Sequence, residues 1–550
     1  MAKVFRSLVD FVTIKDTDDG RPVDRWKSPD ILPVLPKNRR FDSKDYISYW
    51  VAGAVCASFW SMGGTAIANG LTAAESVVAM IIGAVVCSIV AQTCGEPGIK
   101  YHLGFPMMSR ATFGMYGSYF VVVIKCFTNF LYCGIQSYWG GLSVHVILAA
   151  IFPSYHHMKN TLPESANITT ADLIGTVIYM VVFYGVLYIP AYKMNTFFRV
   201  SFVAVLITIV SMFIWAMSAN HGVRNVVAPG THLTKAETFF FMVQAVCTLC
   251  GSFTGASIRH SDWSRYARDR KAPLIGIWVI CPLALTVTAM FGVFVTSACL
   301  QMYGEAIWQP VSLLLYIQQH NYSAAARAGT FFGGVGWFLS QLAVNVSLNS
   351  VAAGMDLTSV LPKYLNARRG GFLLATVGFV VCPWNYVNSA STFTTVLSAF
   401  GLFISPLIGM YIADFWVVRR CNWNVPHLYI GDKTSCYWYK GGYNLLAFGV
   451  WGFMIWPSLP GFAMAISGKD LGLPWKRIFQ ITFFVGMIGG FVFFSILSLL
   501  FMPKDARVNV DYDWSQESNL ILEAESVTDE EKVQHLSVPA DSKNDVKTPL

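Results

Sequence analysis

The segment Gly251-Ser252-Phe253-Thr254-Gly255 lies within an apolar stretch, residues 238–258, that is long enough to cross a membrane as a helix. A glycine lowers helix stability by about 1 kcal/mol relative to alanine, and here two glycines flank two hydroxyl-bearing residues. Irregular backbone at membrane depth is tolerated where it lines a cavity. The segment therefore predicts a broken spanning helix beside a cavity, or alternatively a face of small residues for close helix packing.

A second glycine pair stands in an earlier apolar stretch. Residues 46–69 contain Ala52-Gly53-Ala54, followed by Gly63-Gly64. Transporters built from inverted repeats carry interrupted spans at matching positions of their two halves, and these spans line a site near the bilayer midplane. Close packing through small residues is again the alternative. The candidate gating residues are Gly63, Gly64, Gly251 and Gly255.

The composition is that of a membrane protein. Of the 550 residues, 54% are hydrophobic and 13% are charged, whereas soluble domains carry roughly 25% charged residues. Roughly twelve apolar runs reach the length of a spanning helix, which predicts an all-α polytopic membrane protein with about 12 transmembrane helices. The predicted spans are residues 46–69, 73–94, 117–151, 173–190, 196–219, 238–258, 275–299, 331–354, 371–387, 392–417, 443–467 and 478–502.

Catalytic and cofactor motifs are missing from the sequence. It contains no GxxxxGK[ST] phosphate loop, no HExxH zinc motif and no GxSxG nucleophile motif. Cys247 and Cys250 form a CxxC pair, but this pair lies inside an apolar run without a second pair, which is not typical of a metal or redox site. We therefore expect no enzymatic activity, no cofactor and no metal.

Basic residues predict the orientation, because short cytosolic loops carry an excess of Lys and Arg. A cytosolic N-terminus places two glycosylation sequons, at Asn167 and Asn321, in outer loops. We expect a multi-pass protein of the plasma membrane with both termini in the cytosol. The inner loops then hold Lys193, Arg199, Arg259, Arg265, Arg268, Arg270, Lys271, Lys363, Arg368, Arg369, Arg419 and Arg420.

Two polar tails flank the predicted transporter domain of residues 46–502. Residues 1–45 form an N-terminal cytosolic tail, and residues 503–550 are acidic and Ser-rich, which predicts a disordered cytosolic tail. The candidate ubiquitin attachment sites in that tail, which would make ubiquitin-ligase adaptors partners, are Lys532, Lys543 and Lys547. The net charge of +8 is explained by inner-loop residues that face anionic lipid, so nucleic acid is not expected as a partner.

Polar side chains deep in the third and eighth spans point to a binding site. Tyr132 and Gln136 are spaced to share one helix face, as are Asn345 and Asn349. A side-chain amide offers a donor and an acceptor that match the N–H and C=O edge of a uracil, hydantoin or ureide, and Phe253 and Tyr132 offer stacking faces. Any one amide alone is better explained as a hydrogen bond between helices, worth about 0.6 kcal/mol on average, whereas the set together favours a binding site.

Four segments carry a resemblance to the nucleobase cation symporter family 1, and more closely to its fungal uracil and allantoin permease branch. They begin at Lys27 (KSPDILP), Gly134 (GIQSYWGG), Asp262 (DWSRY) and Asn349 (NSVAAGMDLTSVLP), and the likeness covers about residues 26–500. The resemblance implies a leucine-transporter-type fold. It divides the domain into a five-helix repeat at about 46–219, an inverted repeat at about 238–417, and two further helices at about 443–502.

The resemblance also implies the site residues. The family's third-span glutamine and eighth-span asparagine fall on Gln136 and Asn349, and its sixth-span aromatic residue falls on Phe253. A stacking tryptophan of the family is replaced by Tyr132, and a first-span glutamine by Cys56. The tyrosine keeps a stacking face and adds a hydroxyl, whereas the cysteine removes an amide. These two departures leave the substrate open.

Ion coupling is expected to use protons. Eighth-span hydroxyls that hold sodium in the bacterial hydantoin transporter of the family are replaced here by Ala343 and Val344, which offer sodium no side-chain oxygen. Asp45 and Lys193 lie near cytosolic helix ends and form a candidate gating or coupling pair. Lys125 lies within the third span, where it either pairs with a partner or extends toward the interface.

The expected function is proton-coupled uptake of a nucleobase or related ureide, such as uracil or allantoin, by alternating access. The first alternative is a thiamine, nicotinamide riboside or uridine transporter of the same family. The second is a nutrient receptor that binds the same class of small molecule without transporting it.

Overall fold

The computed structural model describes residues 25–27, 31–189, 194–222, 233–361 and 363–502, and this part of the chain is built from helices. Four short helices lie between the spans: α5 (Phe105–Phe113), α7 (Pro153–His156), α13 (Pro310–His320) and α20 (Leu473–Gln480). The spanning segments are α2 (Ser43–Ala54) with α3 (Ala57–Ala68), α4 (Ala73–Tyr101), α6 (Gly117–Ile151), α8 (Thr170–Leu187), α9 (Asn195–Ala219), α10 (Lys235–Ser257) with α11 (His260–Ser264), α12 (Cys281–Tyr303), α14 (Ala324–Val344) with α15 (Val351–Val360), α16 (Ala367–Val380), α17 (Ala390–Ile412), α18 (Leu445–Ile455) with α19 (Leu459–Ser467), and α21 (Thr482–Phe501).

Hydropathy predicts these spans well. In the described part of the chain, 10 segments are long and apolar enough to cross a membrane, and the bent pair α2 and α3 makes up to 11. The remaining predicted span, residues 371–387, corresponds to α16, which has only 14 residues. It ends early because Pro383 disfavours a helical conformation at the residue before it, and Cys382 there adopts a φ of 53°. The fold is all-α with roughly twelve spanning helices.

The first span is broken, but not at its glycine pair. Helix α2 ends at Ala54, α3 begins at Ala57, and the two are bent by 49°. Gly63 lies inside α3, where a Cβ atom would be 2.1 Å from the Ala289 carbonyl oxygen of α12. The interruption expected at Gly63 and Gly64 is therefore wrong; these glycines let two helix backbones approach closely.

The sixth span is also interrupted at a different place from the one expected. Helix α10 continues through the Gly251–Gly255 segment to Ser257, and the chain turns at Ile258 and Arg259 before α11. A Cβ atom at Gly251 would lie 2.2 Å from the Leu397 carbonyl oxygen of α17. Gly251 thus serves close packing of α10 on α17, and the predicted break within the segment is wrong.

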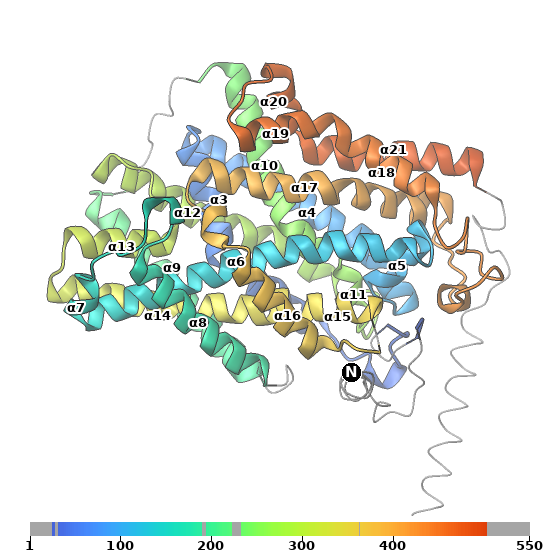
Figure 1. The fold of residues 1–550 in the computed structure, drawn as a ribbon, viewed down its shortest axis with the longest axis horizontal. Helices are drawn as coiled ribbons and strands as arrows, with labels where there is room; N and C mark the ends of the chain where they lie inside the picture. Colours follow the sequence, from blue (N-terminus) through green and yellow to red (C-terminus); the bar gives the residue numbers. More distant parts are fainter. Residues whose placement is uncertain (1–24, 28–30, 190–193, 223–232, 362, 503–550) are drawn as a thin grey trace, which may run out of the picture.

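The helices pack in a reciprocal pattern. Helix α4 contacts α10, α12 contacts α3, and the long helix α6 contacts both α8 and α14. Helices α18, α19 and α21 lie on one flank against α17 (Figure 1). This exchange, in which a helix of each half packs on the broken span of the other, is the arrangement expected of two related repeats.

The division into repeats and tails stays a prediction. Residues 1–24 and 503–550, with the candidate ubiquitin sites, lie outside the described residues.

All twelve cysteines are free. Nine are buried, among them Cys56, Cys247 and Cys250. Only Cys382, Cys421 and Cys436 are partly exposed, and all three lie in connections between helices.

Candidate functional site

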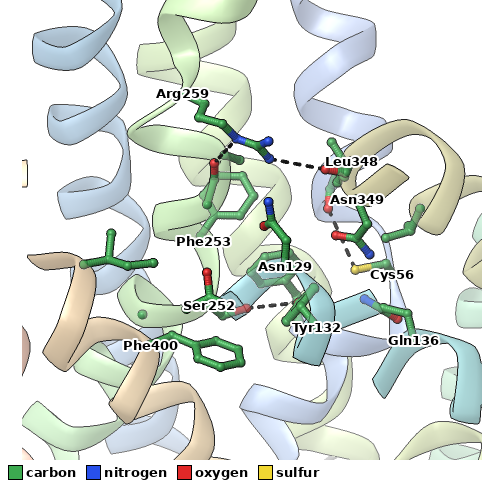
Figure 2. Close-up of a pocket in the computed structure, with 18 of the residues that line it drawn as sticks. Cys56, Asn129, Tyr132, Gln136, Ser252, Phe253, Arg259, Leu348, Asn349 and Phe400 are labelled. Carbon is green, nitrogen blue, oxygen red and sulfur yellow. Dashed lines mark hydrogen bonds between the residues drawn. The ribbon is translucent and has the colours of Figure 1, made fainter. Parts of the chain in front are cut away.

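A cavity lies at the break of the first span. Its walls come from α2, α3, α6, α10, α17 and the segment after α14, so residues distant in sequence meet here (Figure 2). The cavity wall includes all five predicted substrate-binding residues, which are Cys56, Tyr132, Gln136, Phe253 and Asn349, together with Gly251 and Gly255.

Gln136 is fully buried on α6 and has one unused polar atom. Its Nε2 donates a hydrogen bond to the Ser58 hydroxyl of α3 at 2.7 Å. Its Oε1 is buried and has no hydrogen-bond partner within the described residues. A buried unpaired acceptor costs about 1–3 kcal/mol. A ligand N–H in the cavity would remove that cost.

Aromatic side chains line the cavity on several sides. The Tyr132 hydroxyl accepts a hydrogen bond from Ser252 at 3.0 Å, which joins α6 to α10. The Phe253 ring packs against Trp50 and Phe59, with ring centroids 5.5 and 5.2 Å apart. The ring of Tyr132 lies 6.3 Å from that of Phe400. The site therefore offers stacking faces to a flat ring.

The two asparagines of the eighth span have different environments. They lie in a π-helical segment, Asn345–Ser350 (η6), of the kind often found at functional sites. Asn345 donates to the Ser137 hydroxyl at 3.0 Å and to the Tyr179 hydroxyl at 3.1 Å, so it joins helices. Asn349 lines the cavity and donates to Asn345 Oδ1 at 2.8 Å. Asn345 therefore links helices, whereas a substrate contact of Asn349 stays a prediction.

Of the gating candidates, Gly251 and Gly255 line this cavity, whereas Gly63, Gly64 and Asp45 are not part of its wall. Cys56 lies at the helix break, with its thiol 3.8 Å from the Gly53 carbonyl oxygen. Asp45 caps the start of α2, where its carboxylate accepts from the Asp42 N–H at 3.0 Å. Lys193 lies outside the described residues, so the pair with Asp45 stays a prediction.

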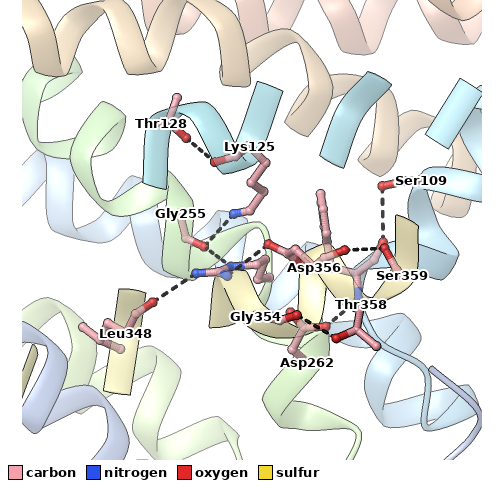
Figure 3. Close-up of polar contacts among 12 residues, drawn as sticks. Ser109, Lys125, Thr128, Gly255, Asp262, Leu348, Gly354, Asp356, Thr358 and Ser359 are labelled. Carbon is pink, nitrogen blue, oxygen red and sulfur yellow. Dashed lines mark hydrogen bonds and ion pairs between the residues drawn. The ribbon is translucent and has the colours of Figure 1, made fainter. Parts of the chain in front are cut away.

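A buried cluster of charged side chains lies at one end of the cavity (Figure 3), and the sequence reasoning did not predict it. Arg259 donates to Asp356 Oδ2 at 3.2 Å and to the Gly255 carbonyl oxygen at 2.9 Å, and Lys125 donates to the same carbonyl at 3.1 Å. Arg259 is only 5% exposed, so its assignment to an inner loop is wrong. Asp356 stands within the family segment that begins at Asn349, and an acidic residue in an otherwise apolar segment was the available signal.

Asn129 is a second residue that the sequence reasoning missed. It lines the cavity from α6, is 6% exposed, and its Nδ2 has no partner within the described part of the chain. Its spacing from Tyr132 and Gln136, by one and two helical turns, was the available signal.

The two sequons lie near each other. Asn167 and Asn321 are both exposed. The connections that carry them meet where the His156 ring stacks on Tyr322, with centroids 4.1 Å apart. Their location at one end of the molecule is compatible with the expected orientation.

The chain is similar in sequence to a family of permeases. A protein-family model described as permeases for cytosine and purines, uracil, thiamine and allantoin matches residues 33–486. Nicotinamide riboside transporter 1 of Saccharomyces cerevisiae is 30% identical over 88% of this chain and 81% of its own. A thiamine transporter of the same yeast is 31% identical over 90% of this chain and 83% of its own.

One solved structure matches the fold closely. Mhp1, a nucleobase-cation-symport-1 family transporter captured closed with bromovinylhydantoin, superposes with a TM-score of 0.67. The match covers 86% of this chain and 96% of Mhp1, at 16% sequence identity. The leucine-transporter-type fold that the sequence resemblance implied is thereby confirmed.

Proposed function

Because this chain belongs to the permease family for cytosine and purines, uracil, thiamine and allantoin, we propose that it takes up a neutral nucleobase or ureide, such as uracil or allantoin, by proton-coupled alternating access. The observation that carries the proposal is Gln136, a residue of the aromatic-walled cavity whose buried Oε1 has no partner within the described residues. An amide N–H of the substrate would satisfy that oxygen. The ring would stack between Tyr132 and Phe253 and bond to Asn349.

The charges around the cavity support a neutral substrate. Arg259 lines the cavity, whereas no Asp or Glu is among the described residues of its wall. The acidic partner of Arg259, Asp356, is fully buried and is already bonded to the guanidinium. A substrate with a fixed positive charge would therefore find no carboxylate in the cavity.

The cluster also supports proton coupling. Asp356 uses Oδ2 for Arg259, while its buried Oδ1 has no partner within the described residues. A proton on this carboxylate would weaken its attraction to Arg259, which lies directly after α10. Proton uptake would thus weaken the Arg259–Asp356 ion pair, which links the sixth and eighth spans. Alternating access requires these spans to move relative to each other. Sodium is disfavoured because Ala343 and Val344 supply no side-chain oxygen.

A second candidate is a vitamin or nucleoside substrate such as thiamine, nicotinamide riboside or uridine. The relatives named above, a nicotinamide riboside transporter and a thiamine transporter, favour it. The aromatic walls of the cavity would accept a cationic ring through cation–π contacts. A fixed positive charge separates thiamine and nicotinamide riboside from uracil and allantoin, whereas uridine is neutral and differs from them by its ribose.

Uptake in a transporter-deficient yeast strain tests the proposal. Labelled uracil, allantoin, uric acid, uridine, thiamine and nicotinamide riboside are supplied at several external pH values, with and without sodium and an uncoupler. We expect accumulation of a neutral ring that increases as the external pH falls, stops with the uncoupler and ignores sodium. Accumulation of thiamine or nicotinamide riboside alone would support the second candidate.

Two other outcomes contradict the proposal. Sodium-dependent accumulation would reject proton coupling. Saturable binding to membranes without accumulation would identify a receptor, the remaining alternative.

A further inference from the structure

Among the described amide side chains of the cavity wall, Asn129 is the one to which the proposed function assigns no substrate contact. It lies on α6, on the same helix face as Tyr132 and Gln136. Its Nδ2 is buried and lacks a partner in the described part of the chain. Figure 2 shows its amide pointing into the space that Gln136, Phe253 and Asn349 also line. A buried donor left unpaired is costly, which is a reason to look for a ligand atom that satisfies it.

The two unpaired atoms of α6 are complementary. Gln136 Oε1 can accept a hydrogen bond, and Asn129 Nδ2 can donate one. The residues stand two helical turns apart, about 10 Å along the axis, and both Cβ atoms tilt in the same direction. The donor of Asn129 and the acceptor of Gln136 therefore belong to cavity residues at different levels of one helix, with Tyr132 between them.

We infer that Asn129 is a specificity-determining residue that donates a hydrogen bond to a ring carbonyl of the substrate, on the edge opposite the N–H that Gln136 accepts. Tyr132 lies between the two amides on the same face, so its ring supports the substrate between both contacts. The site thereby selects cyclic amides, imides and ureides that carry an N–H and a carbonyl on opposite edges. This inference rests on the proposed function, because it concerns the same cavity.

Carbonyl and thiocarbonyl ligands test the contact directly. Uracil, 2-thiouracil, 4-thiouracil, hydantoin and 2-thiohydantoin compete for uptake of the labelled substrate that wild-type cells accumulate. Sulfur is a weak acceptor, so the wild type should prefer the carbonyl form of at least one pair by about 5- to 150-fold. Asn129→Ala and Asn129→Leu should reduce this preference to near unity.

The two variants distinguish the loss of a hydrogen bond from an increase in cavity volume. Asn129→Ala enlarges the cavity, which would admit the larger sulfur atom, whereas Asn129→Leu removes the donor without making room. Loss of the preference in both variants supports a lost hydrogen bond. Ser143→Ala is the matched control, because Ser143 is a buried polar residue of α6 whose hydroxyl bonds the Trp139 carbonyl at 2.9 Å. It should keep the wild-type preference.

Three outcomes would overturn the inference. The first is that the preference for the carbonyl ligand persists in both Asn129 variants, and the second is that only Asn129→Ala loses it. The third is that all five ligands compete less well by the same factor, as a purely structural role of Asn129 would produce. If uptake depends on Gln136 while the Asn129 variants keep the preference, only this inference fails. If the wild type accumulates none of the labelled substrates, the proposed function fails with it.

Discussion

The amide side chains in and beside the cavity differ in their hydrogen-bond partners. The amides of Gln136, Asn345 and Asn349 are chemically alike, yet each has a different set of partners. Asn345 donates two hydrogen bonds to residues of neighbouring helices, whereas the buried Oε1 of Gln136 accepts none within the described residues. Hydrogen-bond partners therefore separate binding residues from residues that hold helices together, which residue type alone does not do.

Gln136→Ala should weaken uptake, because a substrate N–H would lose its acceptor in a closed site. A loss of about 1–3 kcal/mol corresponds to roughly 5- to 150-fold in affinity. Asn345→Ala should instead reduce the amount of protein at the cell surface, since it removes contacts to Ser137 and Tyr179. Fluorescent tagging and uptake kinetics measure both effects. Normal uptake by Gln136→Ala would reject the site.

Asp356→Asn should uncouple transport from the proton gradient. The amide keeps the shape of the side chain and a hydrogen bond to Arg259, but it no longer titrates. We expect the variant to bind substrate in competition assays and to lose both accumulation and its pH dependence. The matched control is Glu96→Gln, which alters another buried carboxylate, one that pairs with the exposed Arg270 at 2.5 Å. An unchanged pH profile in Asp356→Asn would reject this carboxylate as the proton carrier.

Helix positions were predictable from the sequence, whereas helix breaks were not. A bilayer demands long apolar runs, so spans such as α6 and α17 stand out in any hydropathy reading. Glycine weakens helices and also lets helices touch, and only the neighbouring backbone decides between these effects. At Gly63 and Gly251 that neighbour is a carbonyl oxygen of another helix. Arg259 was misjudged for the same reason, because its buried partner Asp356 is distant in sequence.

Gly251→Ala should destabilise the contact between α10 and α17. The added Cβ would lie 2.2 Å from the Leu397 carbonyl oxygen, so the helices must separate. Overpacking of this kind costs about 1–3 kcal/mol. Gly185→Ala on α8 is the control, since no atom lies within 4 Å of its added Cβ. Size-exclusion profiles of the detergent-solubilised variants should show a smaller folded peak for Gly251→Ala alone; equal peaks would contradict the packing argument.

At the scale of the whole molecule, the cavity joins helices from both predicted halves. A ligand that contacts α3, α6, α10 and the segment after α14 together links elements of both predicted halves. Binding of such a ligand should therefore stabilise the folded protein as a unit.

The transported substrate should raise the thermal unfolding midpoint of the purified protein in detergent. A ligand at one hundred times its dissociation constant stabilises the folded state by about 2.7 kcal/mol. Gln136→Ala should show a smaller shift at the same concentration, because its affinity is reduced. A substrate-independent midpoint in the wild type would contradict binding at this cavity.

The distribution of thiols suits the protein to spectroscopy. Only Cys382, Cys421 and Cys436 are partly exposed, and the other nine are buried. Replacing these three with serine would leave a background that maleimide or nitroxide reagents label poorly. Single cysteines placed at the exposed ends of α2 and α14 would then carry probe pairs. Their separation, followed by electron resonance or energy transfer, would report the relative movement of the two halves in a lipid bilayer.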